Sequence, residues 1–160
     1  MLYHSLISSH LKYCNIVWGF SAKKNIKRIH RLQKRSIRLI TNSPYLSSSI
    51  PLFLKLKILP VHEMISLESA IFMFKLSNNM LPDVFSNYFT FNCAVHAYHT
   101  RHAQNIHTPL NRITKTQSCI FYKGTILWNS LPTLVKNSKT LTQFKRLFKK
   151  SLFESLYQQM

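Results

Sequence analysis

The sequence predicts a mainly α-helical protein, a bundle of four to six helices with one small β-hairpin. Three observations favour this fold class. Apolar residues recur at helical spacing over three long segments, 22–41, 61–79 and 141–157. Hydrophobic residues make up 46% of the 160-residue chain, which is enough for a core. The chain has only two glycines, too few for the many turns of an all-β architecture.

The first two expected helices form a basic helical hairpin over residues 1–41. Residues 2–18 are expected to form one helix with a wide apolar face that includes Leu6. Gly19 would end this helix, and Ser21 would cap the next one, over 22–41. The apolar side of helix 22–41 is expected to contain four isoleucines, with two leucines at its edge: Ile26, Ile29, Ile37 and Ile40, then Leu32 and Leu39.

The rest of the chain divides into four expected parts. Residues 42–60 are a linker with a short helix near 52–56, and residues 61–89 hold a buried central helix over 61–79 and a further turn over 84–89. Residues 90–122 are irregular, with a hairpin whose strands lie near 105–110 and 117–122. Residues 123–160 hold a helix over 124–131 and a last helix, 141–157, opened by a capping box of Thr140 and Gln143. The expected core contains Leu6, Ile29, Ile37, Ile40, Met64, Ile71, Phe74, Phe144, Leu147, Phe148 and Leu152.

The length favours a single domain over residues 1–160. Three widely spaced cysteines do not make a disulfide framework, which favours a reducing compartment. The N-terminus lacks the pattern of a secretory signal, and no uncharged apolar run is long enough to span a membrane. We therefore expect an intracellular protein, nuclear or cytoplasmic, that is not secreted.

The charge balance is the strongest indication of function. The chain has 22 Lys and Arg but only 4 Asp and Glu, a formal net charge of +18. Such a surface attracts phosphate backbones. Mg²⁺-dependent chemistry needs clustered carboxylates, and this chain has few to offer. It also lacks the glycine-rich phosphate loops and the GxSxG elbow of hydrolases. We expect binding without catalysis, with no cofactor, no metal and no small-molecule substrate.

The charges concentrate on one side of helix 22–41, where eight cations are interrupted by no acidic residue. An ordinary solvated face mixes signs, so this one favours contact with nucleic-acid phosphates. A nuclear-localisation patch and an anionic membrane surface are the alternatives, but the apolar side is needed for the core. The expected phosphate contacts are Lys24, Lys27, Arg28, Arg31, Lys34, Arg35 and Arg38, followed by Lys145, Arg146, Lys149 and Lys150 on the last helix.

A run of possible zinc ligands lies in the irregular segment. Cys93, His96, His99 and His102 follow at three-residue steps, with His107 beyond them. Structural zinc sites usually need a second close pair of ligands and more than one cysteine. The preferred interpretation is therefore hydrogen-bonding or surface histidines, and the role of these residues stays open.

Several segments, taken in order, resemble the C-terminal, post-polymerase region of reverse transcriptases from non-LTR retrotransposons of the LINE type, jockey-like elements among them. The resemblance is carried by His10-x-x-Tyr13-Cys14-x-x-x-Trp18-Gly19, Leu32-Gln33-Lys34-Arg35-x-Ile37-Arg38, Pro51-Leu52-Phe53, Leu81-Pro82 with Phe85 and Phe89, His96-x-Tyr98-x-Thr100-Arg101, Gly124-x-x-x-Trp128-Asn129-x-Leu131-Pro132, and Ser138 with Phe144-Lys145 and Lys149.

This resemblance implies a thumb-like helical region that binds RNA or an RNA–DNA hybrid and follows a catalytic palm. The palm's Tyr/Phe-x-Asp-Asp motif is absent, and Asp83 is the only aspartate. The resemblance therefore implies a non-catalytic fragment of an RNA-directed DNA polymerase, from a truncated or decayed mobile element, with the palm of a parent polymerase as a further partner.

Two alternatives remain. The chain could be a protein–protein docking module whose apolar faces, on helices 2–18 and 61–79, pack on such a palm. Residues 2–19 also resemble the short module that precedes the catalytic part of AlkB-type tRNA-modifying dioxygenases. Those enzymes bind Fe(II) with a His-x-Asp pair and a distant histidine. Leu81 stands two positions before Asp83, so this chain cannot form that site.

Overall fold

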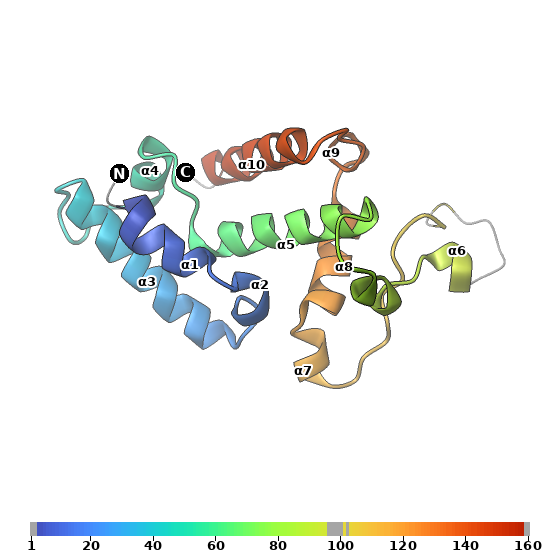
Figure 1. The fold of residues 1–160 in the computed structure, drawn as a ribbon. Coiled ribbons are helices and arrows are strands. Elements are labelled where there is room, and N and C mark those ends of the chain that lie inside the picture. The colour runs from blue at the N-terminus through green and yellow to red at the C-terminus, as the bar shows by residue number, and fades with distance from the viewer. Residues whose placement is uncertain (1–2, 96–100, 102, 159–160) are drawn as a thin grey trace. The chain divides into compact units, whose positions relative to one another are not determined.

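The computed structural model describes residues 3–95, 101 and 103–158. It is mainly helical, which confirms the predicted fold class (Figure 1). Four described helices are longer than ten residues: α3 (Lys23–Ile40), α5 (Val61–Ser77), α8 (Ile120–Ser130) and α10 (Leu141–Tyr157). Helices α3, α5 and α10 fall on the three segments whose apolar periodicity predicts helix, and α8 begins four residues before the helix predicted over 124–131.

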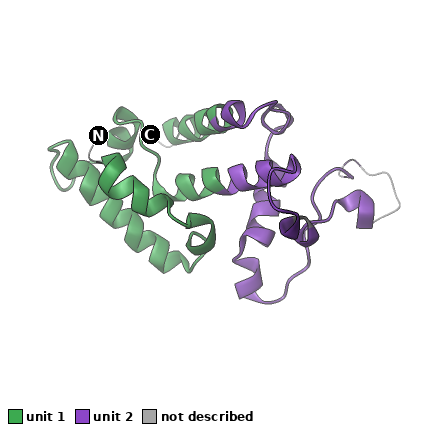
Figure 2. Ribbon diagram, in the orientation of Figure 1, with its two compact units in different colours: residues 1–68, 146–160 green, residues 69–145 purple. Residues whose placement is uncertain are grey.

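The residues group into two compact units (Figure 2). Unit 1 contains residues 1–68 and 146–160, and unit 2 contains residues 69–145. The two boundaries fall inside α5 and α10, so each of these helices contributes to both units. The assignment of residues 1–160 to a single domain stays a prediction.

The single helix predicted over residues 2–18 is wrong, because three short elements replace it. A π-helix, His4–Ser8, leads into α1 (Ser9–Lys12), and α2 (Asn15–Trp18) follows a break. At the break Tyr13 is extended and Cys14 is left-handed, with a φ of 48°. The Trp18 indole N–H donates to the Tyr13 carbonyl at 2.7 Å and stabilises this turn.

Gly19 follows α2 with right-handed backbone angles, so it is not a left-handed C-cap. A glycine is required there for space. A Cβ atom on Gly19 would lie 2.8 Å from Cγ2 of Ile65 and would also collide with the Asn15 carbonyl oxygen. Gly19 therefore allows the turn after α2 to approach α5 closely.

Helix α3 confirms the helix predicted over 22–41, and it buries Ile26, Gln33 and Ile37. Its N-cap is Ala22, without a side-chain hydrogen bond, so the predicted Ser21 cap is wrong. Ile40 is 46% exposed and Leu6 is 63% exposed, so neither belongs to the core as predicted. Ile40 is the last residue of its helix, and Leu6 lies in the π-helix, whose wider turn shifts side chains away from the 100° pattern.

Two apolar clusters of described residues contribute to the core of unit 1. The first brings Tyr3 and Ile37 against Phe53 of α4 (Ile50–Lys55) and Ile58. Helix α4 confirms the short helix predicted near 52–56. The second cluster joins α3 to the start of α5 and contains Ile26, Val61, Met64 and Ile65.

Unit 2 contains the 3-10 helix Asp83–Tyr88 and three further short helices, α6 (Asn92–Val95), α7 (Thr114–Gln117) and α9 (Thr133–Lys136). The predicted hairpin is not confirmed. Among the described residues, the β pairing is an isolated antiparallel bridge between Phe91 and Ile106. The chain is helical from Ile120, where the second strand was expected.

A side chain of α8 takes the place of a partner strand for Ile106. The Ile106 N–H donates to Oδ1 of Asn129 at 3.1 Å, and Nδ2 of Asn129 donates to the Ile106 carbonyl at 2.8 Å. Buried backbone groups need such partners. One asparagine therefore replaces the strand pairing that the β-branched composition suggested.

Aromatic rings and a close helix approach stabilise unit 2. The Phe74 and Phe144 rings stack with centroids 4.5 Å apart, and Trp128 lies 6.1 Å from Phe144. A Cβ atom on Gly124 would lie 3.0 Å from Sδ of Met73, so this glycine also allows close packing.

Of the predicted core, Ile37, Met64, Ile71, Phe74, Phe144, Phe148 and Leu152 are buried, while Ile29 and Leu147 are half-buried.

The start of α10 carries the predicted cap. The Gln143 N–H donates to Oγ1 of Thr140 at 3.2 Å, as a capping box requires. The return bond to Oε1 of Gln143 comes from the N–H of Lys139, at 3.3 Å, one residue earlier than the standard pattern.

Among the residues that the structure describes, none of the helices is both long enough and apolar enough to cross a lipid bilayer.

Candidate nucleic-acid interface

One side of α3 forms a continuous cationic surface, which we call the basic face. Six of its eight cations are exposed, and Lys34 and Arg38 are half-buried. Helix α3 contains no acidic residue, so no ion pair within the helix neutralises the face. The basic face comprises Lys23, Lys24, Lys27, Arg28, Arg31, Lys34, Arg35 and Arg38.

The rotation of α3 is fixed by Gln33, which lies on the side opposite the basic face and is 2% exposed. Its Nε2 atom donates to the Tyr3 hydroxyl at 2.7 Å and to the Leu59 carbonyl at 3.0 Å. Its Oε1 atom accepts the Val61 N–H at 2.8 Å. A buried amide with these partners favours one orientation, because any rotation of α3 would leave polar groups unpaired. The basic face is therefore directed to solvent.

Arg38 connects the end of the basic face to the loop after α3. Its Nε and Nη2 atoms donate to the Ser47 carbonyl at 3.0 and 2.9 Å. Its guanidinium also lies 6.0 Å from the centroid of the Tyr45 ring, within the range of a cation–π contact. These contacts hold the guanidinium of Arg38 in place, whereas the six exposed cations of α3 extend into solvent.

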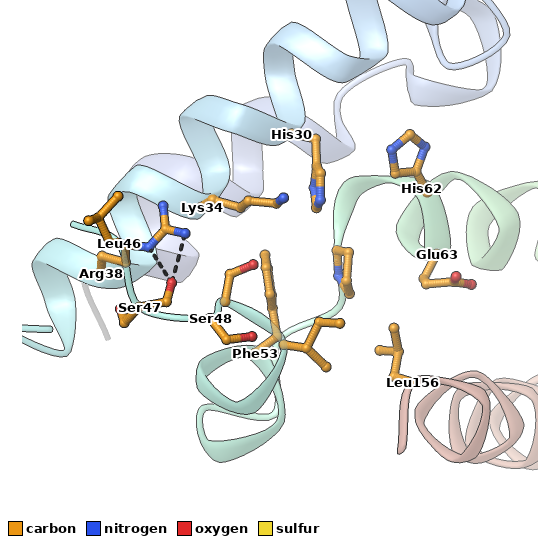
Figure 3. A pocket seen from close by; sticks show the side chains of 13 residues that line it. His30, Lys34, Arg38, Leu46, Ser47, Ser48, Phe53, His62, Glu63 and Leu156 are labelled. Carbon is orange, nitrogen blue, oxygen red and sulfur yellow. Dashed lines mark hydrogen bonds between the residues drawn. The ribbon is translucent and has the colours of Figure 1, made fainter. Parts of the chain in front are cut away.

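A cavity of about 410 Å³ lies beside α3, within unit 1 (Figure 3). Lys34 and Arg38 line it from α3, and Ser47 and Ser48 line it from the following loop. Phe53 of α4 and residues of α5 and α10 complete it. The volume falls within the range of about 300–1,000 Å³ that is typical of small-ligand sites.

Three titratable groups of this cavity have shifted pKa values. The pKa of His30 is lowered to about 4, mainly by burial and in smaller part by the charges of Lys34 and His62. Burial, followed by the charge of Lys34, also lowers the pKa of His62. Burial raises the pKa of the Glu63 carboxyl. Both imidazoles are therefore neutral at pH 7. The charge of Lys34 lowers the pKa of both rings.

The four phosphate contacts that the sequence predicts on the last helix do not form one group. Arg146, Lys149 and Lys150 belong to unit 1, whereas Lys145 belongs to unit 2. Lys150 pairs with Glu154 at 3.8 Å on the surface, and Lys149 lies 5.8 Å from the centroid of the Phe153 ring. The pairing reduces the charge that Lys150 presents to a phosphate.

Sequence reasoning missed the residues that line cavities but lie far apart in the chain. His30, His62, Glu63 and the serines of the loop carry no motif that would assign them to one site. The same holds for Lys12 and Lys57, which line a smaller cavity of about 70 Å³ together with Lys149, a predicted contact. Only the fold brings these groups together.

The possible zinc ligands are only partly described. Cys93 is exposed and its thiol is free. His96, His99 and His102 lie outside the described residues. Within the described part of the chain, no three His, Cys, Asp or Glu residues come together in a way that could hold a metal ion.

Comparison of this chain with models of known protein families, with curated proteins and with solved structures finds no match.

Proposed function

We propose that this protein binds the phosphate backbone of nucleic acid through the basic face of α3 and does not itself catalyse a reaction on it. The supporting observation is the exposure of six cations on one helix that carries no acidic residue. Like charges at this density repel one another, and a bound polyanion relieves the repulsion. Such contacts position a backbone and do not distinguish base sequence.

The proposed partner is RNA or an RNA–DNA hybrid inside the cell. This choice rests on the resemblance to the thumb-like region of LINE-type reverse transcriptases, which follows the polymerase palm. On this proposal the chain binds the nucleic acid, and a separate palm with its own aspartates catalyses polymerisation. The four carboxylates of this chain, Glu63, Glu68, Asp83 and Glu154, are spread along the sequence.

A docking role is the second candidate, and exposed leucines of α3 favour it. Leu32 is 59% exposed and Leu39 is 74% exposed, both beside the basic face. Tyr13 and Val17, from the segment that was expected to dock, are also exposed. Helix α5, the other expected docking element, buries Val61, Met64, Ile65, Ile71 and Phe74. A docking surface would therefore involve α2 and α3 more than α5.

A filter-binding assay on two charge-matched variants tests the first proposal. In the test variant, four exposed cations of α3 are changed to glutamine: Lys27, Arg28, Arg31 and Arg35. In the control variant, four exposed cations of unit 2 are changed in the same way: Arg112, Lys115, Lys123 and Lys139. Both lose the same net charge, and neither touches Lys34 or Arg38.

We expect the test variant to bind single-stranded RNA about tenfold or more weakly than the unchanged protein at ~0.1 M salt, because it loses four phosphate contacts. The control variant should lose much less, and circular dichroism should show the same helix content in all three. Equal losses in the two variants would contradict the proposal, since net charge alone would then explain binding. No RNA binding by the unchanged protein, together with loss of palm binding on Leu32→Ser and Leu39→Ser, would favour docking.

A further inference from the structure

The cavity beside α3 differs in character from one end to the other. Lys34 and Arg38 line one end, next to the serines of the loop. Glu63 lines the other, and Figure 3 shows Arg38 and Glu63 on opposite sides of the cavity. Between them lie the rings of Phe53 and His30, and the His62 ring lies on the same side as Glu63 (Figure 3). A ligand that fits this cavity has an anionic end and a flat, hydrogen-bonding end.

The cationic end is suited to one phosphate group. Lys34 and Arg38 are four residues apart on α3, so their side chains are neighbours on the helix surface. Arg38 uses Nε and Nη2 to bind the Ser47 carbonyl, which leaves donors of its five N–H groups for a ligand. Both residues belong to the basic face as well as to the cavity. A phosphate bound here lies on the path of a backbone that follows α3.

The middle of the cavity offers aromatic planes. The rings of His30 and Phe53 are almost parallel, with an angle of 14° between their planes and 6.0 Å between their centroids. The centroid of the His62 ring lies 5.1 Å from that of His30, and His62 is exposed. Nucleobases stack on such surfaces, and stacking tolerates any base. Both imidazoles are held neutral, so they present no charge to an apolar base face.

The Glu63 end suits a base edge and does not suit a phosphate. A carboxylate repels a phosphate but accepts hydrogen bonds from amino and imino groups of a base. In addition, Nδ1 of His30 is buried and has no hydrogen-bond partner among the described residues. Polar groups of this kind fit the edge of a base better than an apolar ligand.

We propose that this cavity receives one unstacked nucleotide of a single-stranded nucleic acid, with its phosphate on Lys34 and Arg38 and its base beside His30, Phe53 and Glu63. This inference rests on the proposed function of the basic face and specifies its ligand. A base in a duplex is paired and stacked, so it cannot enter the cavity without leaving the helix. The cavity therefore makes the protein prefer single strands.

A cavity-filling variant tests this. Ser48 lines the cavity, is exposed and carries no charge, so Ser48→Phe blocks the space and leaves the basic face intact. Ser21→Phe adds the same side chain at an exposed position of unit 1 that does not line the cavity. The binding partners are a single-stranded RNA and an RNA duplex of equal length.

We expect Ser48→Phe to weaken single-strand binding about tenfold, the effect of losing one stacked base, and to leave duplex binding unchanged. Ser21→Phe should change neither. Unchanged single-strand affinity in Ser48→Phe, or an equal loss for both RNAs, would overturn the cavity proposal. If the basic-face proposal fails, the result is different, because the four-glutamine variant of α3 would then bind both RNAs as tightly as the charge-matched control variant of unit 2 does.

A second measurement needs no variant. Adenosine 5′-monophosphate should shift the NMR signals of the His30 and His62 rings, and inorganic phosphate at the same concentration should shift them much less. Equal shifts with phosphate alone would reduce the cavity to a simple anion site. No shift with the nucleotide would also contradict the proposal.

Discussion

At the scale of single residues, His30 shows how one partly buried titratable group makes the stability of the fold depend on pH. Its ring is half-buried and stacks with the Phe53 ring. The charge of Lys34 acts on it and lowers its pKa. Protonation would place a second positive charge beside Lys34 in a poorly solvated position. The lowered pKa, about 4, therefore couples the protonation of His30 to folding.

This coupling predicts lower stability in acid. The folded state binds the His30 proton less tightly than the unfolded chain, in which the pKa of a histidine is near 6.5. Stability should therefore fall as the pH is lowered from about 6.5 toward 4. Because solvent screens a half-buried ring, we expect a loss on the order of 1 kcal/mol between pH 7 and pH 5. Urea unfolding at several pH values measures it.

Neighbouring groups must be separated from this effect. His62, whose pKa is also lowered, contributes in the same direction, whereas the raised pKa of Glu63 stabilises the folded state as the pH falls. The variant His30→Gln should show a flatter pH dependence than the unchanged protein, and His10→Gln, at an exposed position, should not. Identical pH profiles for His30→Gln and the unchanged protein would show that His30 does not carry the effect.

At the scale of elements, the orientation of α3 decides what the protein presents to solvent. The helix itself follows from its apolar periodicity, but the periodicity places a polar residue, Gln33, on the buried side. The buried position of Gln33 is explained by its hydrogen bonds, because its amide joins α3 to Tyr3, Leu59 and Val61. One side chain thus connects three segments and directs the basic face outward.

Replacing this amide should destabilise the protein strongly. Gln33→Leu keeps the side-chain volume but leaves the Leu59 carbonyl and the Val61 N–H buried without their partner. We expect a loss of about 2–4 kcal/mol, seen as a lower midpoint of urea unfolding. Tyr3→Phe removes only one of the three bonds and should cost about 1 kcal/mol. If Gln33→Leu unfolded at the same urea concentration as the unchanged protein, the connecting role of Gln33 would be refuted.

At the scale of the whole molecule, long periodic segments were predictable and non-local arrangements were not. Helices α3, α5 and α10 follow from the repeat of apolar residues, and the Thr140 cap follows from a local pattern. The break at Cys14 and the substitution of Asn129 for a partner strand depend on contacts across the fold. No local signal in the sequence reports such contacts.

The candidate site divides in the same way. The basic face was predicted residue by residue, because it depends only on helical geometry and charge. The cavity was not predicted, since Lys34, Phe53 and Glu63 come from three helices whose packing brings them together. Glycine positions carry a similar lesson, because Gly19 and Gly124 permit close packing and do not form turns of positive φ.

The central claim is that cations of α3 bind phosphates, and the salt dependence of RNA binding tests it most directly. If five or six side chains contact phosphates, the logarithm of the binding constant should fall against the logarithm of salt concentration with a slope of about −4 to −5. Removing Lys27, Arg28, Arg31 and Arg35 should flatten the slope by about one unit for each lost contact. A slope near zero for the unchanged protein, or the same slope in the variant, would contradict the account.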